Sequence, residues 1–180
     1  WALDITSLTA TDPEWNDVLD QLKRSEAVSM VGIGATGTPA VPSVGKPKLD
    51  DRDGPAQSLG FVGNVRRGVG FPCAFVLAQA WNQRLNYEYG VAFGNEMAGV
   101  NLEGIFGFGC NIHRSPFGGR NFEYYSEDAF LSGQICAYEV YGCLTKGLYS
   151  YIKHFAVNDN EEQRSGLYTW LSEQALREIY

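Results

Sequence analysis

The stretch LYSYIKHF, residues 148–155, decides the fold class. Residues 148–152 are a short apolar and aromatic run typical of a buried strand, and Lys153 and His154 follow it directly. A second run of this kind, GIFGF at 104–108, precedes it, with a helical pattern in between. Strands that alternate with helices of this length are typical of a parallel α/β architecture. In such folds the active site lies just beyond the carboxyl ends of the strands, where Lys153 and His154 are expected.

Three further segments have the spacing of helices. The segment 73–99 has side chains of one face every three or four positions, namely Leu85, Tyr89, Ala92, Phe93 and Glu96. Asp128 is an expected N-cap for a helix that runs to about Lys146, and a last helix begins near Ser172. The order of these segments supports the α/β reading.

The sequence pattern in the first third of the chain indicates less regular structure. The tetrapeptide TDPE at 11–14 is typical of a helix start, and a second short helical piece follows Ser25. From residue 32 to residue 70 the chain is crowded with Gly and Pro, so we expect a long structured loop with short strands.

Residues 31–37, VGIGATG, match the dinucleotide fingerprint G-x-G-x-x-G. That fingerprint requires a helix that begins at its last glycine, with its N-terminus facing the pyrophosphate. Pro39 and Pro42 follow at once and prevent such a helix. We therefore interpret the stretch as a strand end that runs into a turn.

Composition excludes several classes of partner and cofactor. The formal net charge of −7 argues against nucleic acid, and the apolar runs are far shorter than a membrane span. The first residues, WALD, lack the basic start and apolar run of a signal peptide. The sequence also begins without Met, so the compartment stays open, with the cytoplasm slightly favoured. The cysteines have no C-x-x-C spacing, so no metal or cofactor is expected; Cys136 and Cys143, on a predicted helix, are expected to be core thiols.

Three polar clusters are expected just beyond the carboxyl ends of strands, where a parallel α/β fold has its active site. They are DDRDGP at 50–55, NIHRSPFGGRNFE at 111–123 and KHF at 153–155. Carboxylate, guanidinium, ammonium and imidazole groups that converge with aromatic rings suit a sugar. The charged groups hydrogen-bond vicinal hydroxyls, and the rings pack on the C–H faces of a pyranose.

Each cluster also has a structural interpretation. The tripeptide DGP is by itself an ordinary turn. The arginines of the second cluster, Arg114 and Arg120, could form an ion-pair network with Glu123 and Glu127. Lys153 and His154 are harder to explain in this way, because they lie at the functional end of a strand.

Longer motifs resemble one family. The stretches DGP, NIHRSPFGGRNFEYYSED, KHFAVND followed by Glu162 and Arg164, and SEQALREIY are very similar to consecutive motifs of family 3 glycoside hydrolases of the β-glucosidase type. They occur in the family's order, and the resemblance runs from about Pro13 to the last residue. It implies that residues 1–180 are the first half of a TIM-like (β/α)8 barrel, which is incomplete in this chain.

The resemblance also implies an activity and a substrate. The family hydrolyses terminal non-reducing β-D-glucosyl residues by a retaining mechanism, in which one carboxylate attacks the anomeric carbon and another acid protonates the leaving oxygen. The expected ligand is a β-glucoside or a short oligosaccharide. Hydroxyls of the sugar in subsite −1 would be held by Asp53, Arg120, Lys153 and His154, with Arg114 and Glu123 bracing the site from behind. The family's nucleophile is an Asp in a later Ser/Thr-Asp-Trp motif that is absent from 1–180, so no catalytic residue is assigned here.

Departures from the family pattern refine this expectation. After DGP the family usually has a Gly and soon an Arg, whereas AQSL stands at 56–59, which leaves the details of this loop open. The tripeptide AVN at 156–158 replaces the Pro-Gly-His of the N-acetylglucosaminidase branch. The xylosidase branch tends to replace the Asp of DGP, so Asp53 favours a hexose with a hydroxymethyl group, such as glucose.

Length leaves two alternatives. A whole barrel takes about 250 residues, so these 180 hold only part of one. In the first alternative the remainder of the barrel, in the same or a separate chain, completes the enzyme. In the second, the chain is a catalytically inactive truncated barrel that binds sugar or self-associates, because a homo-oligomer would cover its open strand edges.

Lys153 and His154 are both expected to face one sugar ring. Successive side chains of a regular strand point to opposite faces, so the alternation must break within 153–155. A bulge, a sharp φ/ψ change or a non-proline cis peptide would break it, and the resemblance favours the cis peptide. The alternative is that one of the two side chains packs against a helix instead.

Overall fold

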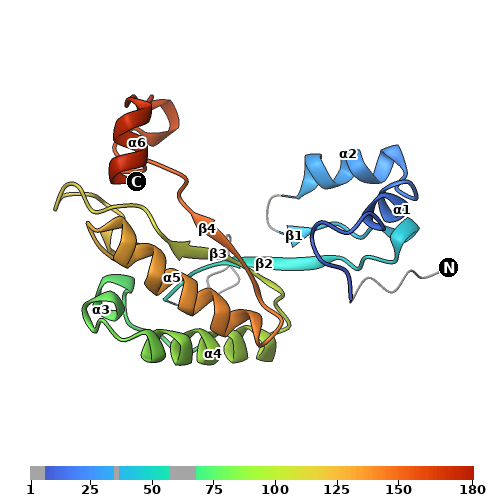
Figure 1. Ribbon diagram of the computed structural model, residues 1–180, viewed down its shortest axis with the longest axis horizontal. Helices are drawn as coiled ribbons and strands as arrows, with labels where there is room; N and C mark the ends of the chain where they lie inside the picture. Colours follow the sequence, from blue (N-terminus) through green and yellow to red (C-terminus); the bar gives the residue numbers. More distant parts are fainter. Residues whose placement is uncertain (1–6, 35–36, 57–67) are drawn as a thin grey trace. The chain divides into compact units, whose positions relative to one another are not determined.

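The computed structural model describes residues 7–34, 37–56 and 68–180 (Figure 1). The chain forms two compact units, Trp1–Asp51 and Arg52–Tyr180. All the candidate site residues belong to the second unit. The expectations for WALD at 1–4 and for the loop that departs from the family at 57–59 lie outside the described residues.

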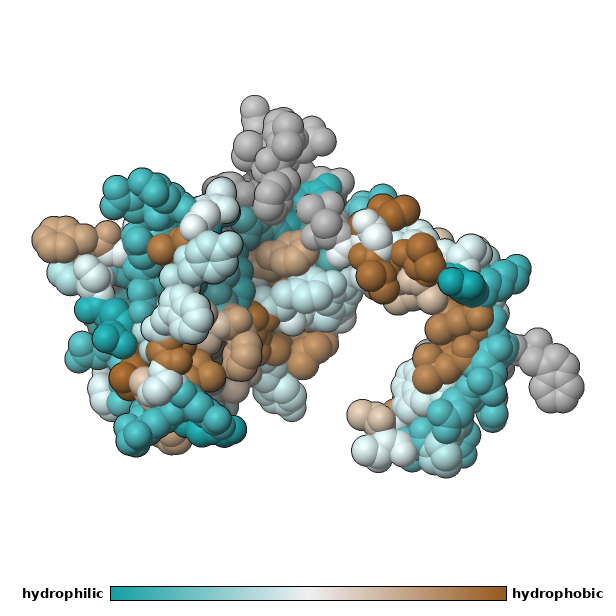
Figure 2. Space-filling model, turned by 90° about the horizontal axis from the view of Figure 1, so that it is seen from above, coloured by the Kyte–Doolittle hydropathy of each residue, from teal (hydrophilic) through white to brown (hydrophobic). Residues whose placement is uncertain are grey.

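The first unit is built from short elements. Its helices are α1 (Trp15–Leu19), α2 (Arg24–Ile33) and the 3₁₀ turn η1 (Pro42–Val44). Strand β1 (Gly37–Thr38) pairs antiparallel with the start of β2 (Leu49–Asp53), with Gly37 opposite Asp50. Neither α1 nor α2 buries a residue, and brown apolar side chains gather over the surface where α2 lies (Figure 2).

The prediction of a strand end at 31–37 was wrong. Residues up to Ile33 belong to α2, and β1 then begins at Gly37. The Glu26 carboxylate accepts a hydrogen bond from the Lys23 backbone N–H at 3.1 Å, so it satisfies a free donor at the start of α2 and stabilises the helix there. Gly37, the last glycine of the fingerprint, begins β1 and not a helix, as Pro39 and Pro42 predict.

The second unit alternates helices and strands. In chain order it contains α3 (Ala74–Gln79), α4 (Gln83–Gly99), β3 (Gly104–Gly109), η2 (Asn121–Glu123), α5 (Ala129–Leu144), β4 (Tyr149–Lys153), η3 (Arg164–Gly166) and α6 (Glu173–Ile179). The predicted strands at 104–108 and 148–152 and the helices after Asp128 and Ser172 are confirmed. Across the described residues, none of these helices has the length and apolar character needed to cross a membrane.

The helix predicted at 73–99 is interrupted. It divides into α3 and α4 at residues 80–82, where Trp81 has a φ of 50°. Asn82 then caps α4, because its side-chain oxygen accepts a hydrogen bond from the Leu85 N–H at 3.0 Å. An Asn that can bond the backbone in this way favours the start of a new helix over continuation of the old one.

The parallel pairing of β3 and β4 brings the polar segments together. Ile105 lies opposite Ser150 and Gly109 opposite Lys153 in this pairing. The end of β2 runs beside β3, since the Gly54 N–H donates to the Phe106 carbonyl at 3.2 Å. The segments that follow these strands therefore meet at one edge of the sheet.

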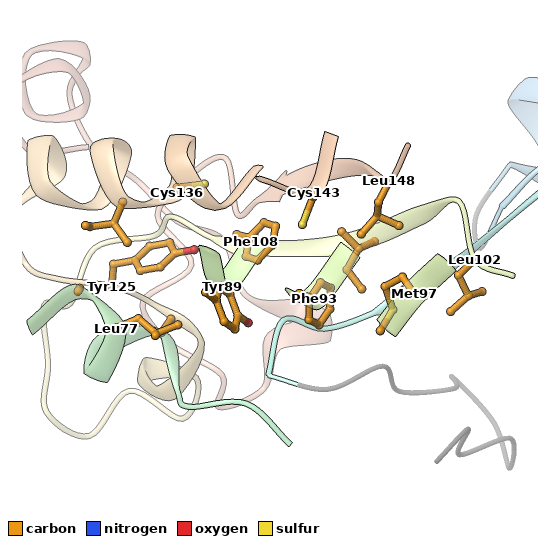
Figure 3. Packing of buried hydrophobic residues seen from close by; sticks show 14 residues of the cluster. Leu77, Tyr89, Phe93, Met97, Leu102, Phe108, Tyr125, Cys136, Cys143 and Leu148 are labelled. Atoms are coloured by element: carbon orange, nitrogen blue, oxygen red, sulfur yellow. The ribbon is translucent and has the colours of Figure 1, made fainter. Parts of the chain in front are cut away.

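The core lies between the sheet and the helices α4 and α5, which run side by side (Figures 1 and 3). The rings of Phe93 and Phe108 are both fully buried and meet edge to face, with centroids 5.9 Å apart. Cys136 and Cys143 line the same core as free, buried thiols, which confirms their predicted place. These contacts hold β3 against the two helices.

Two glycines permit the close approach of α4 and α5. A Cβ atom on Gly90 would lie 2.1 Å from the Glu139 carbonyl oxygen, and one on Gly142 would lie 2.3 Å from that of Tyr87. Any side chain at either position would separate the helices. Gly133, also in α5, is exposed and has no atom within 4 Å of its Cβ direction.

Gly142→Ala is expected to lower the free energy of unfolding by about 1–3 kcal/mol. The added methyl group meets the backbone carbonyl of Tyr87, which cannot move without the rest of α4. The matched control, Gly133→Ala, should instead raise it by about 0.5–1 kcal/mol through helix propensity. Urea denaturation of the two variants measures both effects. Equal effects of the two substitutions would show that α4 and α5 do not touch at Gly142.

Candidate functional site

Lys153 connects the ends of two strands that are far apart in the sequence. Its ammonium Nζ lies 2.7 Å from Asp53 Oδ1, at the end of β2, and 3.6 Å from Glu123 Oε2. The side chains of Lys153 and Glu123 are only 16% and 12% exposed. Because water screens such a pair less than a surface pair, the carboxylates hold the ammonium in a defined position.

Arg120 is oriented by two carboxylates. Its Nη2 and Nε donate to the two oxygens of Glu123 at 2.7 and 3.2 Å, and its Nη1 lies 3.6 Å from Glu161 Oε1. Burial acts to lower the pKa of Arg120, but the hydrogen bonds and charge of Glu123 outweigh it and raise that pKa. This two-point pairing fixes the plane of the guanidinium group.

Glu161 belongs to the cluster, although the family motif pointed to its neighbour Glu162. Glu161 accepts hydrogen bonds from Asn158 Nδ2 at 2.8 Å and from Arg164 Nη1 at 2.9 Å. Burial acts to raise the pKa of Glu161, but these two hydrogen bonds and the charge of Arg120 lower it overall. Glu162 uses its backbone N–H to bond Asn160 instead. Only the proximity of Glu161 to the KHFAVND motif could have indicated it.

His154 lies in the same cluster as Lys153. Its Nδ1 is 2.8 Å from the Tyr124 hydroxyl oxygen, and the peptide bond between Lys153 and His154 is cis. The predicted irregularity within 153–155 is therefore confirmed. Burial, together with the charges of Arg120 and Lys153, lowers the pKa of His154 to about 4. The imidazole is thus uncharged at neutral pH.

Arg114 lies apart from this cluster. Its Nη1 is 3.4 Å from the hydroxyl of Tyr180, whose O–H donates to Asp159. Asp159 in turn accepts a hydrogen bond from the side chain of the buried Asn111 at 2.8 Å. Of the ion-pair network considered above, the described residues contain the Arg120–Glu123 pair but no ion pair of Arg114 or Glu127.

The cluster balances its charges and its hydrogen-bonding groups. The carboxylates of Asp53, Glu123 and Glu161 face the cations of Lys153, Arg120 and Arg164, with the neutral His154 among them. Such a set of donors and acceptors suits an uncharged ligand with several hydroxyls. In the described ranges, no group of three His, Cys, Asp or Glu side chains could hold a metal ion.

The low pKa of His154 makes a contribution to stability that depends on pH. Below its ordinary pKa of 6.5 the unfolded chain takes up a proton at His154, whereas the folded chain does so only near pH 4. The contribution is therefore complete above pH 6.5 and is lost as the pH falls to about 4. We expect an NMR titration of the His154 ring to have its midpoint near pH 4. The spectrum of His154→Gln, which lacks these signals, distinguishes them from those of His113. A midpoint near 6.5 would contradict the burial of this imidazole.

Known proteins give an independent comparison. Residues 55–180 match the family model described as the glycosyl hydrolase family 3 N terminal domain. The chain is 40% identical over 173 residues to beta-glucosidase A of Butyrivibrio fibrisolvens, covering 91% of this chain and 21% of that protein. It is 34% identical over 172 residues to thermostable beta-glucosidase B of Acetivibrio thermocellus, covering 91% of this chain and 23% of that one. The chain thus spans about a fifth of the length of these relatives.

Solved structures agree with this assignment. Beta-glucosidase 3B from Thermotoga neapolitana, in complex with glucose, matches 92% of this chain with a TM-score of 0.79 and 37% identity, and 26% of its own chain is covered. The beta-glucosidase from Kluyveromyces marxianus, also in complex with glucose, matches 92% of this chain with a TM-score of 0.82 and 33% identity, and 20% of its own chain is covered. The predicted fold class is confirmed, since the parallel α/β sheet corresponds to half of the (β/α)8 barrel. With its family model covering most of its residues, this chain belongs to glycosyl hydrolase family 3.

Proposed function

We propose that this chain supplies the sugar-binding residues of subsite −1 in a retaining β-glucosidase. The observation that carries the proposal is the contact between Lys153 and Asp53, which joins the ends of β4 and β2 and has His154 beside it. Residues 1–180 are then the N-terminal half of a barrel domain, completed by the remainder of the barrel in the same or a separate chain. That remainder provides the nucleophile and the acid.

The groups around Lys153 have hydrogen-bonding capacity to spare. The hydrogen bonds that Asp53 accepts within the described residues, from Lys153 and from the Gly54 N–H at 3.2 Å, both end on Oδ1. Its Oδ2 has no partner among the residues that the structure describes, and we infer that it accepts from a hydroxyl of the sugar. An ammonium has three hydrogens, so Lys153 also retains donors after it bonds Asp53. Together the two side chains can bind vicinal hydroxyls, one as acceptor and the other as donor.

The roles of the remaining residues follow from their contacts. Arg120 and His154 add donors to the same ring, and Glu123 braces both Arg120 and Lys153 from behind. Arg114 supports the site only indirectly, through Tyr180 and Asp159. A preference for glucosides is supported by Asp53, as the sequence motif implies, and by the relatives whose structures contain glucose.

Asp53→Asn tests the acceptor role of this side chain in the full-length enzyme. Loss of a charged acceptor costs about 1.5–3 kcal/mol per hydrogen bond, so kcat/KM for aryl β-glucosides should fall about ten- to a hundredfold. Asp50→Asn is the matched control, because Asp50 lies on the same strand but pairs with Lys48. Kinetics within about twofold of the parent for Asp53→Asn would remove Asp53 from the site.

The 180-residue chain by itself is expected to show no hydrolysis of aryl β-glucosides, because the motif that holds the family's nucleophile is absent from its sequence. Loss of such a residue costs many orders of magnitude in rate. The measurement is the release of the aryl group by the purified chain. Turnover that disappears in Asp53→Asn or Glu123→Gln would show that the catalytic carboxylates lie in this cluster instead.

A further inference from the structure

A neutral histidine can face its ligand either as a donor or as an acceptor. One ring nitrogen carries a proton and the other has a lone pair, and the partner of one nitrogen decides the state of the other. Nδ1 of His154 has a partner, the Tyr124 hydroxyl, and no described residue hydrogen-bonds Nε2. The tautomer of His154 therefore depends on where Tyr124 directs its proton.

The direction of the Tyr124 hydrogen bond depends on Glu161, whose ionised carboxylate can only accept hydrogen bonds. Its carboxylate is held by Arg164 at 2.9 Å and lies near Arg120, so it stays ionised. The atom of the Asn158 side chain that lies 2.8 Å from Glu161 must then be the NH2 group, because a carbonyl oxygen there would face another oxygen. The carboxylate of Glu161 therefore fixes the orientation of this amide.

The direction of the next two hydrogen bonds follows. The same Asn158 nitrogen lies 2.8 Å from the Tyr124 hydroxyl oxygen, so Tyr124 accepts from it. Burial raises the pKa of Tyr124, so the phenol keeps its one proton. That proton points to the other neighbour of the oxygen, His154 Nδ1, at 2.8 Å. A nitrogen that accepts a hydrogen bond carries no proton, which places the ring proton of His154 on Nε2.

We propose that Glu161, Asn158 and Tyr124 are positioning residues that hold His154 in its Nε2–H tautomer, so that it offers a hydrogen-bond donor to a substrate oxygen. The inference rests on the proposed function for the identity of that substrate, a glucoside. The backbone of Asn158 is itself fixed, because its N–H donates to the side chain of the buried Asn111 at 2.8 Å. In this relay of hydrogen bonds from Glu161 through Asn158 and Tyr124 to His154, the first two residues are therefore held in place by Arg164 and Asn111.

The relay determines whether Nε2 of His154 donates a hydrogen bond to the sugar or accepts one from it. Lys153 and His154 then both act as donors, while Asp53 is the acceptor beside them. With the other tautomer, the lone pair of Nε2 would face the sugar and could bind only the hydrogen of a hydroxyl. The choice is made by hydrogen bonds alone, since His154 carries no charge at neutral pH.

The tautomer can be read directly by NMR of the full-length protein labelled with ¹⁵N-histidine at pH 7. We expect a pyridine-type resonance for Nδ1 and a pyrrole-type resonance for Nε2 of His154. In Asn158→Asp the carboxylate can only accept, so the Tyr124 hydroxyl would donate to it and accept a hydrogen bond from Nδ1–H of His154. Nδ1 should then give the pyrrole-type resonance and Nε2 the pyridine-type resonance. Tyr168→Phe, an exposed tyrosine, is the control and should leave both unchanged. A wild-type Nδ1–H tautomer, or no change in Asn158→Asp, would overturn the inference.

Glucose binding separates this inference from the proposed function. Tyr124→Phe removes the donor to Nδ1, so we expect averaged ring resonances and glucose binding weakened about three- to tenfold, the effect of one neutral hydrogen bond. Tyr168→Phe should bind glucose as the parent does. If the tautomer is as expected but the parent binds no glucose, the proposed function fails and the relay stands. If the parent binds glucose and Tyr124→Phe alters neither resonances nor affinity, the relay fails.

Discussion

The parallel pairing of β3 and β4 is the constraint on which the rest of the second unit depends. Two parallel strands cannot be joined by a tight turn, so the chain must cross over through α5. That helix packs on the sheet and on α4, and Gly90 and Gly142 let the two helices approach closely enough to bury the aromatic core. Both strands then end at the same edge, where their polar residues meet.

The cluster at that edge is organised by charge rather than stabilised by it. Partly buried ion pairs gain little net stability, because desolvation offsets most of their attraction. Their effect here is geometric: Glu123 holds Arg120 and Lys153, and Glu161 orients the Asn158 amide. Under the proposed function, a sugar would meet donors and acceptors already in place, so less ordering would be required on binding.

Local features and contacts between distant residues differ in how well they could be predicted from the sequence. The N-caps Asp128 and Ser172 act within one turn, so local sequence was enough to place α5 and α6. The split between α3 and α4 was missed, because the periodic pattern continues through residues 80–82. Tyr124, Asn158 and Glu161 were missed as site residues, since nothing local distinguishes them from other loop residues. Arg114 was expected to brace the site together with Glu123, and its contact with Tyr180 could not be predicted from neighbouring positions.

The sequence by itself determined the α/β class, the family and the main polar residues of the cluster, because apolar runs and long motifs are properties of neighbouring positions. Only the tertiary structure decided which of those residues touch. Lys153 and Asp53 are 100 positions apart, and their contact exists because three strand ends converge at one edge. The direction of the hydrogen bonds from Glu161 to His154 was likewise decided in space, since a proton's position depends on every neighbour that can accept it.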